Sequence, residues 1–426
     1  MADSMLQMLR NGLPVRTMGE KALIVAVAIC LMFLTPPNIV SAYGDSFVRA
    51  VFRYGQYASI AVAVAAFALR GRLSVFSVVA IAYALFGILT ALVGGATFSS
   101  GVRSTLPFVA AALLACAMMP RRRKELLWGV LLIYGAYSVV NLVVILMVPA
   151  ESSVLHFSEI STLFGNRNSF NRFYIAAIFA SFLLDESRGR YISVRSVIVY
   201  AVAVVQSLVM PSATALVALL LVTIGYFLVV GRKLRHVLTA FTYAGLYLTA
   251  FLAFVVVRVQ GVFGLLIESV MGKTLDFSGR TLIWDAAFDA MDPSHLLLGY
   301  YRGGTSPLGS IWSGQCWSAH NAVLDLLVWG GLAGLLLGCG LIGLACLRLW
   351  KTRNERRSAL YSLYLGACFI CGLMEAIMFP QFGLFLGMAY SDSFSDERSS
   401  EAERPRGSLH ESFARTRLAN WNNRER

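Results

Sequence analysis

Charged residues are scarce in this chain of 426 residues. Lys, Arg, Asp and Glu make up 14% of it, whereas hydrophobic residues make up 58%. The mean hydropathy of +0.68 lies above that of soluble globular domains, which excludes a soluble fold. So many apolar residues also exclude a disordered chain, and the 36 Gly show no period of three, which excludes collagen. A polytopic helical membrane protein remains.

Cysteine is also sparse, and sequence patterns for bound metals or nucleotides are missing. Of the seven Cys, only Cys316 lies in a predicted connection; the others fall in apolar segments and are expected to be small buried side chains. We find no metal-ligand pair, no phosphate-binding glycine loop and no nucleophile elbow. The sequence therefore predicts neither a metal nor a cofactor.

Apolar runs recur along the chain and predict an all-α integral membrane protein with about 12 transmembrane helices, at about 20 residues per span. The two weakest runs are 197–210 and 382–390. The predicted spans are 22–40, 50–69, 73–93, 105–119, 126–148, 173–184, 197–210, 213–230, 238–257, 322–346, 359–378 and 382–390.

The net charge of +13 would suggest a nucleic-acid partner for a soluble protein, but here its distribution reflects topology. Lys and Arg cluster in alternate connections, for example Arg121 to Lys124 and Arg353 to Arg357. Because cytoplasmic loops carry the excess of basic residues, both termini are predicted to be cytoplasmic. We predict a single membrane domain over residues 1–390 and a disordered cytoplasmic tail over residues 391–426, with no nucleic-acid partner.

Two connections on the predicted outer face, residues 149–172 and 258–320, are longer than the rest, and functional residues are expected there. In the longer loop, Ser278 or Gly279 can start a short predicted helix that stops at Pro293, and Arg280 lies in its first turn. A cation in a first turn opposes the helix dipole and needs an anionic partner. That partner is either a local carboxylate, Asp276 or Asp285, or a bound phosphate that also uses the helix N-terminus. The apolar residues on one face of this helix are Ile283, Trp284, Ala287, Phe288 and Met291.

Three further positions combine polar chemistry with a place near the predicted outer boundary. His320 ends the long loop. It is either an anchor at the membrane interface or a general base, and the second role is possible because imidazole titrates near neutral pH. Asp325 and Glu375 are carboxylates in apolar stretches, where such groups face a partner or a polar cavity. Glu375 reads either as a structural ion pair with a loop arginine or as part of a site.

The shorter loop carries Arg167 and Arg172 among three asparagines. This composition suits the binding of an oxyanion or of sugar hydroxyl groups, and it equally suits a solvated basic loop.

The chain resembles a known family at several short motifs. His320-Asn321 is followed after nine residues by Gly331 and then by Gly334, which resembles the signature of the bacterial O-antigen ligases and the related O-antigen and exopolysaccharide polymerases. The segments 278–284 and 165–171 also look like motifs of this family, and Glu375 matches an acidic position near its C-terminal end. The resemblance implies a GT-C-like membrane fold with a large periplasmic loop between helices 9 and 10.

The resemblance also implies a function. Members of this family are metal-independent glycosyltransferases of the bacterial inner membrane that need no cofactor. Their donor is an undecaprenyl-diphosphate-linked glycan, and the periplasmic acceptor is a glycan or a lipid; membrane lipids and a chain-length regulator are further candidate partners. His320 would act as base, Arg280 would hold the diphosphate, and Gly331 and Gly334 would allow close helix packing. The implied substrate-binding residues are Arg172, Arg167, Arg302, Asn321 and Glu375.

One position departs from the family pattern. Many ligases carry an Arg in the outer turn between the seventh and eighth spans, where this chain has Ala213. Arg172, Arg167 or Arg302 would have to supply that cation. The departure favours a polymerase, which joins lipid-linked repeat units, over a ligase, which transfers the glycan to lipid A core or to protein. A transporter or flippase for lipid-linked glycans is a more distant alternative, and a non-catalytic membrane scaffold a last one.

Overall fold

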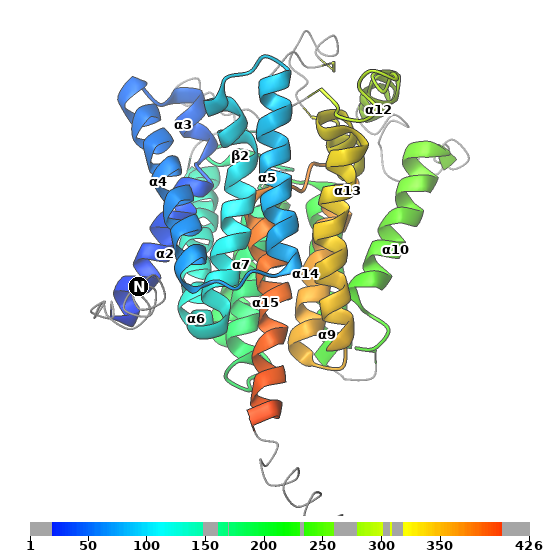
Figure 1. Cartoon of the computed structure of the whole chain (residues 1–426). Coiled ribbons are helices and arrows are strands. Elements are labelled where there is room, and N and C mark those ends of the chain that lie inside the picture. Colours follow the sequence, from blue (N-terminus) through cyan, green and yellow to red (C-terminus); the bar gives the residue numbers. More distant parts are fainter. Residues whose placement is uncertain are drawn as a thin grey trace, which may run out of the picture.

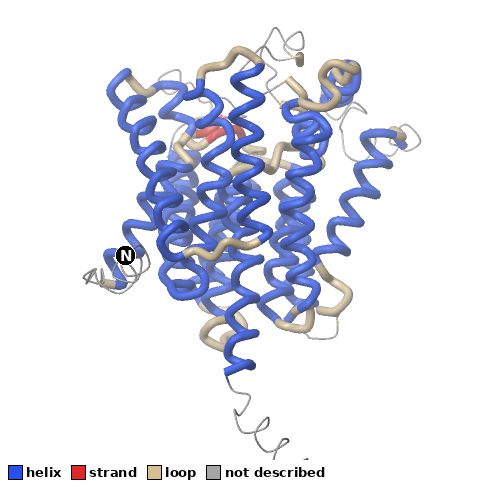
Figure 2. The backbone as a smooth tube through the Cα atoms, in the orientation of Figure 1, coloured by secondary structure: helices blue, strands red, loops and turns tan. Residues whose placement is uncertain are grey.

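The computed structural model describes residues 19–147, 161–168, 170–230, 234–259, 279–300, 307–308 and 318–402. Within these ranges the chain is a bundle of helices, accompanied by one short antiparallel strand pair in which Ser161 faces Asn166 (Figures 1 and 2). The predicted all-α class is confirmed. The elements are α2 Glu20–Leu34, α3 Asn38–Tyr43, α4 Ser46–Arg70, α5 Val75–Val93, α6 Phe98–Met147, β1 Ser161–Thr162, β2 Gly165–Asn166, α7 Asn171–Glu186, α8 Val194–Val209, α9 Ala213–Val230, α10 Ala240–Phe251, η1 Leu252–Val256, α12 Arg280–Asp289, α13 Ala322–Lys351, α14 Arg356–Gly372 and α15 Pro380–Ala402.

Four of the described helices, α4, α5, α6 and α13, are long and apolar enough to cross a membrane. Each of the twelve predicted runs contains helical residues, while the count of twelve spans stays a prediction. Large apolar side chains such as Leu69, Phe227 and Leu336 point outward and are more than two-thirds exposed. An outward apolar surface of this kind suits a lipid environment.

The long helix α6 contains two predicted spans, because it folds back at Arg122. That residue leaves the helical conformation, with φ −135° and ψ 35°. Pro120 lies just before the break, where its ring disfavours a continuous helix. Four consecutive basic residues follow, and Arg121 Nη1 donates to the last carbonyl of α4, that of Arg70, at 3.2 Å.

The centre of the bundle is formed where α6 packs against α7 and α15. On α15, a Cβ atom added at Gly383 or Gly387 would lie 2.4 Å from a backbone oxygen of α6, that of Phe108 or Ala112. Two glycines four residues apart thus let the two helix backbones touch. Such small residues are the usual means of close helix packing in membranes.

Three predicted boundaries are wrong. The first run ends at Leu34, because Pro36 and Pro37 separate α2 from α3. The run 359–378 also breaks early: α14 ends at Gly372, and residues 373–379 form a link to α15. Finally, the predicted solvated tail does not begin at residue 391. Helix α15 continues to Ala402, and Asp392 is 2% exposed because it pairs with two arginines. Residues 403–426 lie outside the described ranges.

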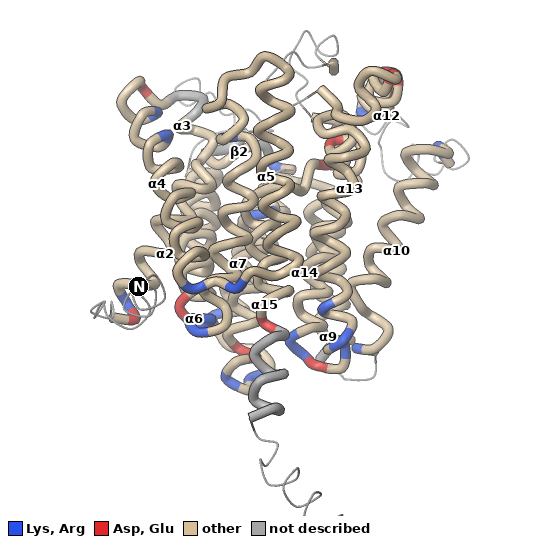
Figure 3. Tube along the Cα trace, in the orientation of Figure 1, with Lys and Arg blue, Asp and Glu red and all other residues tan. Residues whose placement is uncertain are grey.

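The two ends of the bundle differ in charge (Figure 3). Lys and Arg gather at the lower end in this view, around the α6 fold and the start of α14. We call this the basic end. The upper end, called the site end below, carries α12 and the N-terminal end of α13 (Figure 1).

Candidate functional site

Glu375 joins two of the predicted site residues. One carboxylate oxygen, Oε2, lies 3.1 Å from His320 Nδ1, and the other, Oε1, accepts from Arg280 Nη2 at 3.1 Å. The Arg280 Nε also donates to the Met374 carbonyl at 3.3 Å. All three side chains are 13 to 28% exposed, so the cluster is accessible but partly shielded. Residues 280, 320 and 375 therefore form one site, which we call the His–Glu–Arg site.

Arg280 is positioned by the packing of α12. The helix begins after Gly279, whose φ of +83° lies in the left-handed region that glycine favours. Ile283 and Trp284 on the inward face are fully buried, in a cluster that includes Leu324 of α13. The expected helix and its apolar face are thus confirmed, although Phe288 is 39% exposed.

The predicted local partner Asp285 pairs instead with Arg258, at 2.6 Å. The other predicted partner, Asp276, lies outside the described residues. Arg280 makes its ion pair with Glu375, which lies 95 positions away in the sequence. The predicted meeting of Glu375 with a loop arginine is confirmed.

His320 is held in an unusual backbone conformation. Its φ is +47°, a value that costs a non-glycine residue free energy and is often found at functional sites. The His320 amide donates to Ser318 Oγ at 3.1 Å, and Ser318 Oγ in turn donates to Asp325 Oδ1 at 3.0 Å. Asp325, buried one turn into α13, also accepts from the Ala319 amide at 3.3 Å. The predicted partner of this buried carboxylate is therefore the backbone turn that presents His320.

Asn321, a predicted substrate-binding residue, makes hydrogen bonds that hold the start of α13 in place. Its side chain is fully buried and caps α13, because Oδ1 accepts from the amides of Val323 and Leu324 at 3.0 and 3.2 Å. Its Nδ2 donates to the Leu373 carbonyl at 3.2 Å. The amide thus ties the start of α13 to the link that carries Glu375, and it fixes His320 relative to Glu375.

Arg172 packs against the link of residues 373–379 that carries Glu375. Its guanidinium stacks on the ring of Phe379 at 3.9 Å. Arg172, Glu375 and Gln381 line one cavity of about 30 Å³, large enough for a water molecule. Arg172 is therefore a cation that lines the same cavity as Glu375.

Arg167 lies elsewhere, in a second cavity that is also lined by Ser212 and Ala215. These two residues flank Ala213, where the family pattern has its Arg. Ser212 Oγ donates to Asn168 Oδ1 at 2.8 Å, which ties the shorter loop to this turn. Among the described candidates, Arg167 rather than Arg172 is the cation beside this turn. Arg302 lies outside the described residues.

Gly331 and Gly334 allow close packing, as predicted, but with different neighbours. At Gly331, φ is +59° and α13 is broken. A Cβ atom there would lie 2.4 Å from the Leu297 carbonyl, so the neighbour is the long loop rather than a helix. Gly334 instead faces α5, where a Cβ would lie 3.2 Å from the ring of Phe86.

Backbone groups that the break in α13 leaves unpaired form hydrogen bonds with the loop. The amides of Leu332 and Ala333 donate to the carbonyls of Leu296 and Leu297 at 2.8 and 3.1 Å, and the Tyr300 amide donates to the Val328 carbonyl at 2.7 Å. Broken helices in membrane proteins need such partners, because lipid offers none.

The turn between α12 and this docked segment is built around Asp292. Hydrogen bonds, first from Ser294 and then from His295, lower the pKa of the Asp292 carboxyl to about 2. The carboxylate therefore stays ionised over the neutral range. His295 Nδ1 lies 3.0 Å from Asp292, and its ring stacks on Tyr300 at 3.8 Å. This second loop histidine is thus part of a structural turn.

In chemical terms, the His–Glu–Arg site combines a proton acceptor, a carboxylate that orients it and a cation for an anionic group. Within the described ranges, no three His, Cys, Asp or Glu side chains are arranged to hold a metal ion. Two buried amides at the second cavity, Asn141 and Gln206, were not among the predicted site residues. Their signal was available, since each interrupts an otherwise apolar run. No protein-family model matches the chain, and no curated protein matches it either.

Proposed function

We propose that the protein is a glycosyltransferase that uses a polyprenyl-diphosphate-linked glycan at the outer face of a bacterial inner membrane. The observation that carries the proposal is the His–Glu–Arg site itself, in which a single carboxylate holds an imidazole and a guanidinium. Transfer of a glycan from a diphosphate needs a base for the acceptor and a cation for the leaving group, and these are the two groups present.

The proposed reaction uses each residue in turn. The acceptor hydroxyl oxygen attacks the anomeric carbon of the donor, while its proton passes to His320. The bond between that carbon and the diphosphate oxygen breaks, and its electron pair leaves with the diphosphate. Arg280 neutralises the charge that develops there, sharing its guanidinium between the leaving group and Glu375. Glu375 holds the imidazole through Nδ1, which assigns proton transfer to Nε2.

We favour polymerisation of a cell-surface polysaccharide over ligation of the finished glycan, because Ala213 replaces the Arg found in many ligases of the resembling family. Arg167 beside this turn is the candidate for the missing cation.

The test is the profile of lipid-linked glycans, by mass spectrometry, in a null strain complemented with wild type, His320→Ala or Arg280→Ala. Both variants are expected to accumulate donor, since each removes a group that acts on the transferring bond. Accumulated single repeat units identify a polymerase, whereas accumulated long lipid-linked chains identify a ligase.

Matched controls come from the same loop. His295→Ala removes the structural histidine, and Arg258→Ala removes an arginine that pairs with Asp285; both are expected to restore the wild-type profile. If His320→Ala and Arg280→Ala also restored it, the catalytic assignment would be wrong, and the transporter alternative would then come first.

A further inference from the structure

A small cavity lies beside Glu375, where the first turns of α7 and α15 meet the link of residues 373–379. Its volume is about 30 Å³, which is room for about two water molecules. Arg172 on α7, Glu375 on the link and Gln381 on α15 contribute the long polar side chains of its lining. We call it the link cavity.

Gln381 lines the link cavity with an amide that has no partner. The residue is 1% exposed, and over the described residues neither its Oε1 nor its Nε2 has a hydrogen-bond partner. Arg172 Nε, which is also buried, is unpaired in the same part of the chain. Buried polar groups left in this state are destabilising, and they are rare in native proteins.

Two other polar side chains of the lining already have partners. Asn171 Nδ2 donates to Cys371 Sγ at 3.2 Å, and the Tyr364 hydroxyl donates to the main-chain carbonyl of Gln381 at 3.3 Å. The unpaired capacity of the described lining therefore belongs to Arg172 and to the side chain of Gln381.

Glu375 has acceptor capacity to spare. A carboxylate offers about four lone-pair positions. One of them accepts from Arg280 Nη2 and one lies against His320 Nδ1, both at 3.1 Å. A donor inside the link cavity can therefore bond to Glu375 without displacing either member of the His–Glu–Arg site.

The link cavity suits a ligand that both donates and accepts hydrogen bonds. Arg172 Nε and Gln381 Nε2 need an acceptor, whereas Gln381 Oε1 and the carboxylate of Glu375 need a donor. An anion would be repelled by the two kinds of oxygen, a cation would be repelled by the guanidinium, and an apolar group would leave every atom unpaired. Water meets all four needs, and it matches the volume.

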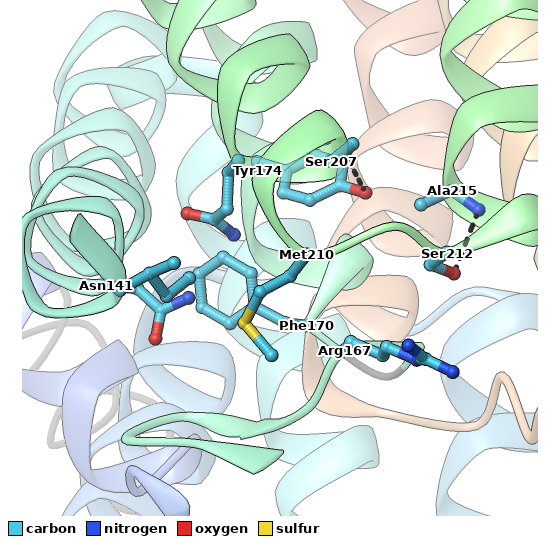
Figure 4. A pocket seen from close by; sticks show the side chains of 10 residues that line it. Asn141, Arg167, Phe170, Tyr174, Ser207, Met210, Ser212 and Ala215 are labelled. Carbon is cyan, nitrogen blue, oxygen red and sulfur yellow. Dashed lines mark hydrogen bonds between the residues drawn. The ribbon is translucent and has the colours of Figure 1, made fainter. Parts of the chain in front are cut away.

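The second cavity, between α6, α7, α8 and the turn before α9, offers a comparison. Its volume is about 10 Å³, which is room for about one water molecule. Its described lining also has unpaired atoms, namely both polar atoms of Asn141, Gln206 Oε1 and Arg167 Nε. Figure 4 shows Asn141 on one side of it and Arg167 with Ser212 on the other. That described lining includes no residue of the His–Glu–Arg site.

We propose that the link cavity holds about two water molecules, the water cluster, which join Arg172 and Gln381 to Glu375 by hydrogen bonds. Gln381 is thereby a positioning residue, because it helps to hold the carboxylate that orients His320, and Arg172 brings a second cation to that carboxylate. The water cluster follows from the cavity alone, whereas the positioning role rests on the proposed function and deepens it.

The first experiment detects the water in the full-length protein in nanodiscs. X-ray pulses convert bound water into hydroxyl radicals, which oxidise the side chains in contact with it, and mass spectrometry gives the rate for each residue. Cys371 lines the link cavity, whereas Cys116 and Cys346 are similarly buried thiols outside its lining. We expect Cys371 to be oxidised at least about tenfold faster than the other two. Gln381→Met, which keeps the size of the side chain but removes its donor, should abolish most of this difference.

The second experiment asks whether Gln381 acts through Glu375. We expect Gln381→Met to lower kcat about 3- to 10-fold with little change in KM, because the carboxylate that orients His320 is held less firmly. In a Glu375→Gln background the same substitution is expected to change kcat by less than about twofold, since the group through which it acts is already lost. The matched control is Gln206→Met at the second cavity, whose effect should be the same in both backgrounds.

The outcomes separate the water cluster from the reaction. Oxidation of Cys371 no faster than that of Cys116 and Cys346 would overturn the water cluster. Oxidation that slows as sodium chloride is raised would also overturn it, because an anion would then occupy the cavity. Equal effects of Gln381→Met in both backgrounds would overturn the positioning role. If His320→Ala keeps wild-type activity while Cys371 is oxidised fast, the proposed reaction fails and the water cluster stands.

Discussion

Glu375 is the residue on which the geometry of the candidate site depends, because its two oxygens contact two different functional groups. Glu375→Gln keeps the size and one acceptor oxygen, but it removes the charge that orients His320 and pairs with Arg280. We expect a fall in kcat of about 10- to 100-fold with a much smaller change in KM. Steady-state kinetics with extracted lipid-linked donor measure this split.

The matched control for this variant is Asp289→Asn, which neutralises an exposed acid at the end of α12. It is expected to leave both constants near wild type. A Glu375→Gln variant whose only change is a higher KM would show that Glu375 binds substrate and does not position the proposed base.

Among the helices, the break in α13 at Gly331 gives the clearest prediction about stability. Gly331→Ala places a Cβ in contact with the Leu297 carbonyl and imposes a positive φ on alanine. We expect a loss of more than about 2 kcal/mol in the free energy of unfolding, together with easier proteolysis of the loop. Thermal unfolding in detergent and limited proteolysis measure the two effects.

Two other glycines of α13 serve as a graded comparison. Gly334→Ala meets only a ring edge at 3.2 Å and should cost less, whereas Gly343→Ala enters open space and should stabilise the helix by about 0.5 to 1 kcal/mol. Equal effects at all three positions would contradict the docking of the loop against Gly331.

The elements also show what the sequence could predict. The helical class and the short helix with Arg280 in its first turn followed from apolar periodicity. The meeting of Glu375 with a loop arginine followed from the cost of a carboxylate among apolar residues. The break at Gly331 could not be predicted, because a glycine in an apolar run looks the same whether the helix continues or stops. The cap made by Asn321 and the pocket of Asn141 and Gln206 depend on which helices meet, which one sequence does not display.

At the scale of the whole molecule, a network of ion pairs and hydrogen bonds around Asp392 holds the helices together at the basic end. Arg123 and Arg357 each lie 3.1 Å from this carboxylate, and the Tyr361 hydroxyl donates to it at 2.9 Å. Arg123 and Arg357 also contact Glu186, at 2.9 and 3.7 Å. The network joins α6, α7, α14 and α15.

Removing one member of such a network leaves buried charges without compensation. Asp392→Ala is expected to lower the free energy of unfolding by about 3 kcal/mol. A chain that ends at Tyr390 should lose as much, although it retains every predicted span, whereas a chain that ends at Ala402 should stay close to wild type. Denaturation of the three purified proteins tests this, and an unimpaired chain ending at Tyr390 would refute the role of the network.

The hydrogen bonds between residues 296–300 and α13 also depend on the order in which the two segments are synthesised. Residues 296–300 precede the broken helix in the chain, so they leave the ribosome before α13 does. When the exposed amides of Leu332 and Ala333 arrive, their acceptors are already there. Because of this order of synthesis, the nascent helix α13 need not stay in lipid with unsatisfied backbone groups, each of which costs several kcal/mol.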